Sequence, residues 1–148
     1  MEPFSLIAGN EEVLAVFGRW PSFHDGEIHR LLLDSTRTDE NGLRYASIEL
    51  ALRGWNLTPH VSDEGFYKVE CDSVVNLLFE HVYEVELDGL NHQNVLSELE
   101  LSEVQDAQNP ENKHLAVELV HCYGLSGGFK AAAAKVMSIK PFKVAGAA

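Results

Sequence analysis

Apolar residues at every second position are the feature that most constrains how this chain can fold. Over residues 74–88 this alternation places apolar and aromatic side chains on one face and mostly acidic ones on the other, which a helical period of 3.6 residues cannot do so cleanly. The same period recurs over residues 43–53 and 115–122. Each run is therefore predicted to be a strand, with His81 and His121 on apolar faces.

Turn sequences separate these runs and indicate how they pair. The Asn-Gly pair within residues 39–42 readily supplies the positive φ angles of a tight hairpin, so strands at 27–34 and 43–53 are predicted to be antiparallel neighbours. Residues 55–60 are expected to leave the sheet. Residues 129–140 contain four consecutive alanines and fit a helix by propensity, but the strand and turn rhythm before them favours a final strand.

A short helix is expected before the sheet begins. Asn10 is a residue type that caps helices, Glu11 and Glu12 suit a first turn, and Gly18 would end the helix. Because no βαβ alternation is present, a doubly wound parallel sheet is disfavoured. The predicted fold is α+β but mostly β. It is a single domain over residues 1–148, with one curved antiparallel sheet of six to eight strands, or a partly closed barrel, and a short N-terminal helix.

The charge balance narrows the possible partners. There are 23 acidic and 11 basic side chains and a formal net charge of -12, which argues against nucleic acid and anionic membranes and for a basic partner. No apolar run approaches the length of a membrane span and the first residues lack a signal-peptide pattern, so we expect a cytoplasmic protein. Cys71 and Cys122 are expected to be reduced and partly buried.

The acidic residues gather in one part of the chain. Between Lys68 and Lys113 there is no Lys or Arg. Side chains on one face of a strand repeat roughly every 6.6 Å, so acids at alternate positions would form an array that attracts a basic protein. A solvated face that only maintains solubility is the alternative interpretation. The residues predicted to bind a partner are Glu80, Glu84, Glu86, Asp88, Glu98 and Glu100, the last two lying alongside the others if a hairpin connects them.

Aromatic residues are unusually dense in the segment Phe-Gly-Arg-Trp-Pro-Ser-Phe-His-Asp-Gly-Glu-Ile at positions 17–28. Large rings seek burial, and His24, Asp25 and Glu27 can leave water only with hydrogen-bond partners, so the segment is expected to be a fixed, partly buried junction. His24 and Asp25 could be an acid–base pair or two metal ligands. Adjacent side chains on a strand, however, point in different directions.

Other signatures of chemistry are missing from the sequence. It has no GxSxG or phosphate-loop frame, no CxxC pair and no zinc spacing, so no catalytic residue, metal or cofactor is predicted. Residues 126–128 are interpreted as a turn. Two alternatives stay open. One is a small metal-dependent hydrolase centred on His24 and Asp25, and the other is a ligand-binding barrel whose cavity would be lined by Tyr45, Trp55 and Tyr83.

The segment at 17–28 resembles the FGxWPSFHDAE motif of the immunity protein 50 family, small bacterial proteins associated with polymorphic toxin systems. Gly26 stands at the Ala of that motif, and Tyr-Gly-Leu-Ser-Gly at 123–127 resembles the C-terminal region of the family. The resemblance implies a non-enzymatic protein that binds and blocks a cognate toxin. We expect that toxin to be basic and the protein itself to be a monomer or a weak homodimer. The motif residues would then determine the fold: Trp20, Pro21, Phe23, His24, Asp25 and Glu27.

Overall fold

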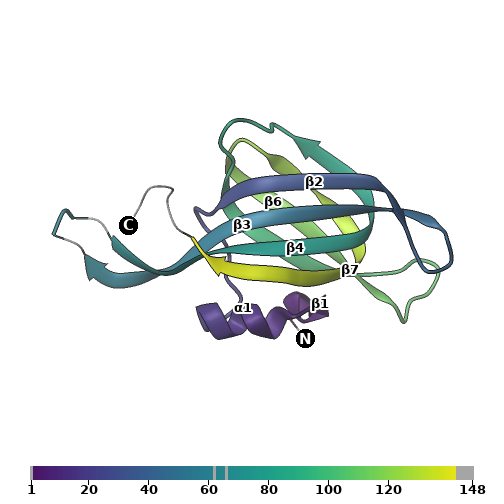
Figure 1. Ribbon diagram of the computed structural model, residues 1–148, viewed down its shortest axis with the longest axis horizontal. Helices are drawn as coiled ribbons and strands as arrows, with labels where there is room; N and C mark the ends of the chain where they lie inside the picture. The colour runs from purple at the N-terminus through teal and green to yellow at the C-terminus, as the bar shows by residue number, and fades with distance from the viewer. Residues whose placement is uncertain (1, 62, 66, 143–148) are drawn as a thin grey trace.

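The computed structural model describes residues 2–61, 63–65 and 67–142, and one sheet dominates it (Figure 1). The elements in chain order are the 3-10 helix η1 (Pro3–Leu6), β1 (Ile7–Ala8), α1 (Asn10–Phe17), β2 (Glu27–Thr38), β3 (Arg44–Val61), β4 (Tyr67–Asp88), β5 (Val95–Gln105), β6 (Lys113–Tyr123) and β7 (Ser126–Pro141). No helix in this described part of the chain is both long enough and apolar enough to cross a membrane.

The strand pairings of the sheet form a ring. The strand order is β1-β7-β4-β3-β2-β5-β6, and β6 pairs in addition with β7. Every pairing around the ring is antiparallel, whereas the two-residue β1 lies beside β7 in parallel. The prediction of one curved, mostly antiparallel sheet with a short N-terminal helix is confirmed.

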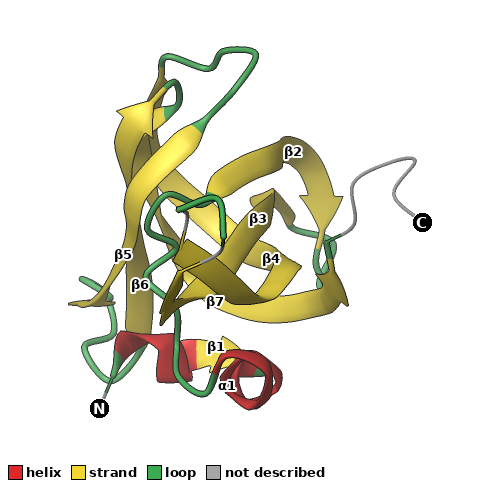
Figure 2. Cartoon of the chain, turned by 90° about the vertical axis from the view of Figure 1, so that its left-hand side faces the viewer, coloured by secondary structure: helices red, strands yellow, loops and turns green. Residues whose placement is uncertain are grey.

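The hydrophobic core lies inside this ring. Alternate side chains of β3 and β4 are fully buried there. Burial of each such Leu, Ile, Val or Phe stabilises the folded state by roughly 1.5–3 kcal/mol relative to an exposed position. Helix α1 packs outside β7, where Val13 and Phe17 join the same cluster (Figure 2). The inward residues with the least exposure include Ile48, Leu50, Leu52, Val75, Leu77, Phe79, Leu96, Leu115, Val117, Leu119 and Ala131.

Helix α1 has glycine at both ends. Gly9, with φ 82°, is the N-cap, and Asn10 is already helical, so the predicted Asn10 cap is wrong. The Asn10 amide instead donates to the Ile7 carbonyl oxygen at 2.8 Å. Gly18 ends the helix as predicted, with φ 78° and its N–H donating to the Leu14 carbonyl.

The predicted hairpin between strands 27–34 and 43–53 is confirmed, although both strands are longer. Residues 55–60 do not leave the sheet, because the first part of β4 pairs with them, for example Leu57 with Val69. This part of the β3–β4 hairpin projects from the ring (Figure 1).

The predicted alternation of β4 is interrupted after Glu80 and resumes at Glu86, where Leu87 again packs against the core and Asp88 is exposed. His81 and Glu84 have positive φ angles of 55° and 49°, and the register with β7 shifts between Tyr83 and Glu86. Such irregularities re-aim the side chains that follow them. Val82 therefore packs against the core and His81 is exposed, which corrects the predicted faces.

His121 and both cysteines are more exposed than predicted. His121 is exposed where β5 and β6 change register, not on an apolar face. Cys71 and Cys122 are free as expected, but both are exposed and not partly buried.

The final strand is confirmed, because β7 covers residues 129–140. It begins at Ser126, so residues 126–128 belong to a strand and not to a turn. The alanine run suits this position: Ala131 and Ala134 are buried, and Ala134 lies opposite both Phe79 of β4 and Ile7 of β1. Small side chains leave room for these two larger neighbours.

Candidate protein-binding face

The predicted acidic residues of β4 and β5 come together, but by a different route from the hairpin that the sequence suggested. Strands β4 and β5 do not pair, because β7 and β6 lie between them. Register links them across the sheet: Glu86 lies opposite Gly128, Gly128 opposite Glu118, and Glu118 opposite Glu100. We call Glu86, Glu118 and Glu100 the acidic row.

Neighbouring positions extend the acidic row into an acidic face. Asp88 lies opposite Ser126, and Glu98 lies opposite Val120, two residues further along the same strands. Adjacent strands are roughly 4.8 Å apart, so the carboxylates are spaced by one or two strands across the sheet. The acidic face comprises Glu84, Glu86, Asp88, Glu98, Glu100 and Glu118, all of them exposed.

The centre of the acidic face is hollow. A surface pocket of about 360 Å³ is lined by the whole acidic row together with Glu84 and Lys130. Gly128 has no side chain to fill the space between Glu86 and Glu118. A Cβ there would lie 2.5 Å from the Val117 carbonyl oxygen, so the backbone is too close to admit one.

Among the described residues, Lys130 of β7 is a cation that lies on the acidic face. The Lys130 Nζ is 2.6 Å from a Glu84 carboxylate oxygen, and this contact raises the pKa of the Lys130 ammonium group. Glu84 is thus partly neutralised by a residue of β7, far outside the Lys-free stretch of sequence. Within the described residues, no ion pair is formed by the acidic row.

Glu80, the sixth predicted residue, lies apart from the acidic face. Its carboxylate accepts a hydrogen bond of 3.0 Å from the Tyr45 hydroxyl and is 3.9 Å from Lys135 Nζ. The bond from Tyr45 raises the pKa of that phenol. Glu80 therefore already has partners within the fold.

Glu118 belongs to the acidic face, but the sequence did not single it out. It follows Lys113, just outside the interval that lacks Lys and Arg, and it is the only acidic residue on its strand. The alternation of β6 puts Leu115, Val117 and Leu119 inside, which correctly places Glu118 outside. Its proximity to Glu100 depends on strand order, which the sequence does not reveal.

The segment at 17–28 closes the ring of strands. Only Glu27 and Val95 pair as ladder residues between β2 and β5. Around them, the Asp25 N–H donates to Leu96 O at 2.9 Å, Leu96 N–H to Gly26 O at 2.8 Å, and Leu99 N–H to Ser22 O at 2.8 Å. The segment thus forms a junction between two strands, as expected. We call these contacts the seam between β2 and β5.

Aromatic packing holds the seam in place. Phe23 is only 2% exposed, with φ 60°, and its ring makes edge contacts with Phe17 and Trp20 at 6.5 and 6.4 Å between centroids. Pro21 is buried, and Gly54 lies against Phe23: a Cβ on Gly54 would be 2.7 Å from the ring. These residues therefore have a structural role in the seam.

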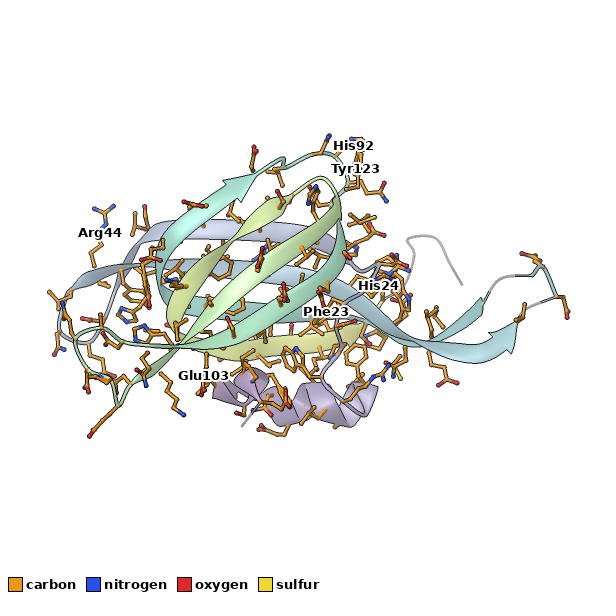
Figure 3. All side chains as sticks on the ribbon, turned by 180° about the vertical axis from the view of Figure 1, so that it is seen from behind. Phe23, His24, Arg44, His92, Glu103 and Tyr123 are labelled. Carbon is orange, nitrogen blue, oxygen red and sulfur yellow. The ribbon has the colours of Figure 1, made fainter. Side chains whose placement is uncertain are left out.

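His24 and Asp25 are exposed at the surface of the seam, and Figure 3 labels His24 beside the buried Phe23. Both side chains are 60% exposed, with His24 Nε2 3.5 Å from Asp25 Oδ2. The other ring nitrogen, Nδ1, is 2.9 Å from the Ser97 carbonyl oxygen, so the imidazole ties the motif to β5. Across the described residues, no three His, Cys, Asp or Glu side chains are grouped so that they could hold a metal ion.

Glu27 takes part in a network centred on Arg53. The guanidinium donates to both Asp72 oxygens at 3.0 and 2.9 Å, lies 3.4 Å from Glu27 and is 3.9 Å from the centre of the Phe142 ring. The bonds to Asp72 raise the pKa of Arg53. The network joins β2, β3 and β4 at the base of the projecting hairpin.

The three aromatic residues considered for a ligand cavity lie at three separate places. Tyr45 stacks on His81 with 4.3 Å between ring centroids. Trp55 lies beside Arg53, and Tyr83 shares a hydrogen bond of 2.8 Å with His114.

The fold and the surface define a predominantly β-stranded protein with an aromatic seam and a carboxylate-rich outer face. The model of the family described as Immunity protein 50 matches residues 9–142. The chain therefore belongs to this family of immunity proteins. No curated protein and no solved structure is significantly similar to it.

Proposed function

We propose that this protein neutralises a bacterial toxin by binding it through the acidic face. Membership of the immunity protein 50 family supports a toxin partner. The acidic row is the reason for proposing this surface. Glu100 and Glu118 are directly opposite each other, and like charges in such positions destabilise a sheet. A basic partner would relieve that repulsion.

The partner proposed here is a toxin with a basic surface. The formal net charge of -12 would attract such a protein from a distance, and the pocket over Gly128 would accept a Lys or Arg side chain. A nuclease, whose active site binds an anionic backbone, is one class of toxin with this surface. The acidic face is held rigidly, since β7 and β6 are each paired on both sides.

Charge reversal on the acidic row tests the proposed surface. The ligand would be a catalytically inactive form of the cognate toxin, to be sought among the products of neighbouring genes, with association followed by surface plasmon resonance at low salt. For the triple variant Glu86→Lys, Glu100→Lys and Glu118→Lys we expect the association rate to fall about 10-fold or more, because electrostatic steering is reversed.

A charge-matched control variant distinguishes the effect of where the charges lie from the effect of the net charge. Glu11→Lys, Glu40→Lys and Glu64→Lys change the net charge equally at exposed positions on α1 and in two turns. This control should retain most of the wild-type rate. Equal loss in both variants would mean that the acidic face is not the binding surface, and absence of wild-type binding would contradict the proposed function itself.

A further inference from the structure

One edge of β2 has no neighbouring strand in the described part of the chain. Beyond Ile28, β2 pairs only with β3, and β5 runs away from it after the seam (Figure 2). Register shifts between Ile28 and Arg30 and between Asp34 and Arg37 limit the regular part of this edge to residues 30–34. Unpaired backbone groups on such an edge can bind another strand.

Two leucines of this edge are exposed. Leu32, opposite Glu49, is 46% exposed on the outer face. Leu33 lies opposite the fully buried Ile48 and therefore faces inward, yet it is 50% exposed. An inward leucine is half exposed here because the neighbouring strand that would cover it has turned away.

We infer that a second copy of this chain pairs with β2, edge to edge and antiparallel, about a two-fold axis at Leu32. In that register Leu31 lies opposite Leu33 of the second copy on the inner side. On the outer side Leu32 meets its own counterpart. Arg30 lies opposite Asp34 of the second copy, and the symmetry produces this pair twice.

The charges of the edge are self-complementary, which identifies a second copy as the occupant. The Arg30 side chain is 58% exposed, with one guanidinium nitrogen 2.9 Å from Glu49 and other donors available. Asp34 Oδ1 accepts both hydrogen bonds from Thr36, and Oδ2 has Arg37 Nε at 4.0 Å. Asp34 Oδ2 can therefore accept a hydrogen bond from Arg30 of the second copy.

The pairing would close after two chains, because each edge is used once and the contact is isologous. Five residues per strand bury less area than a standard stable interface, so the dimer is expected to be weak. Its bulged ends would also prevent longer edge-to-edge assembly.

Sedimentation velocity of the purified protein tests the dimer. As concentration rises from about 1 µM to about 1 mM, a range chosen for a weak contact, the mass should shift from the monomer value of 16.4 kDa towards twice that value. A wild-type protein that stays monomeric at the highest concentration would overturn the inference.

Charge exchange tests the register. Arg30→Asp and Asp34→Arg each place like charges across the two-fold axis, so each should weaken dimerisation at least 10-fold. The double variant restores opposite charges and should recover much of the loss. Failure of this recovery in a double variant with normal circular dichroism would rule out the proposed register.

Controls distinguish this edge from other surfaces. Arg19→Asp makes the same charge change as Arg30→Asp at an exposed residue after α1 and should leave dimerisation unchanged. Leu32→Lys should abolish the dimer, whereas Leu43→Lys, at a residue 65% exposed, should not. If the protein alone is monomeric and the toxin protects the amides of residues 30–34 from hydrogen exchange, the edge binds a toxin strand and the dimer is wrong.

Discussion

At the scale of single residues, Glu118 is the position where charge repulsion within the acidic face is greatest. Its side chain is opposite Glu100 on the neighbouring strand, and the described residues include no ion pair with either. The repulsion weakens the fold but adds to the field that a basic partner experiences.

Glu118→Gln should therefore stabilise the free protein while slowing toxin association. Removing one of two facing charges is expected to raise the free energy of unfolding by on the order of 0.5 kcal/mol at low salt. Urea denaturation in low-salt buffer measures this. Glu98→Gln, opposite the uncharged Val120, should change stability less, and a loss of stability in Glu118→Gln would contradict the proposed repulsion.

The sequence indicated most residues of the acidic face, but not the residues of β7 that lie between them. Alternation and the Lys-free interval pointed to five of its six members. Lys130 and Gly128 could not be connected with them, because they come from β7, which inserts between β4 and β6. Glu80 was included because it alternates in step with Glu84 and Glu86 in the sequence, which does not reveal the positive φ angles at His81 and Glu84.

At the scale of elements, the seam lets two strands with few ladder contacts complete the ring. Phe23 fits tightly against Gly54, and its segment contributes the hydrogen bonds that join β2 to β5. The sequence predicted that this segment would be a junction. It could not show which strands the junction joins, since residues 22–28 and 94–99 are far apart along the chain.

Gly54→Ala should destabilise the protein through the Phe23 ring. Its Cβ would lie 2.7 Å from the ring, and such overpacking typically costs about 1–3 kcal/mol. Phe23→Ala alone should cost about 3–5 kcal/mol by leaving a cavity. In the double variant the Gly54→Ala cost should largely disappear, as measured by thermal or urea unfolding, whereas additive losses would show that this contact is not the cause.

Most strands were recognisable from alternation and turn residues, which are local properties. Their order was not, because it depends on which edges remain free once the hairpins have formed. The β4–β7 and β6–β7 pairings decide that order, and they leave β7 in the middle of the acidic face.

At the scale of the whole molecule, the formal net charge of -12 should govern how quickly the toxin arrives. Screening shortens the range of this field from about 30 Å at 0.01 M salt to about 3 Å at 1 M. The association rate should therefore fall steeply with salt while the dissociation rate changes much less. Stopped-flow measurements over this range test the expectation, and the acidic-row triple variant should show a shallower slope. A rate insensitive to salt would contradict electrostatic steering.

The central position of β7 also affects when the protein becomes active during its synthesis. This last strand contributes the glycine floor of the pocket and separates β4 from β6, and it anchors β1 from the opposite end of the chain. A ribosome-bound chain that has not yet released β7 has neither a complete ring nor an assembled acidic face. If the acidic face binds the toxin as proposed, protection would begin only after β7 has left the ribosome and paired with β4 and β6.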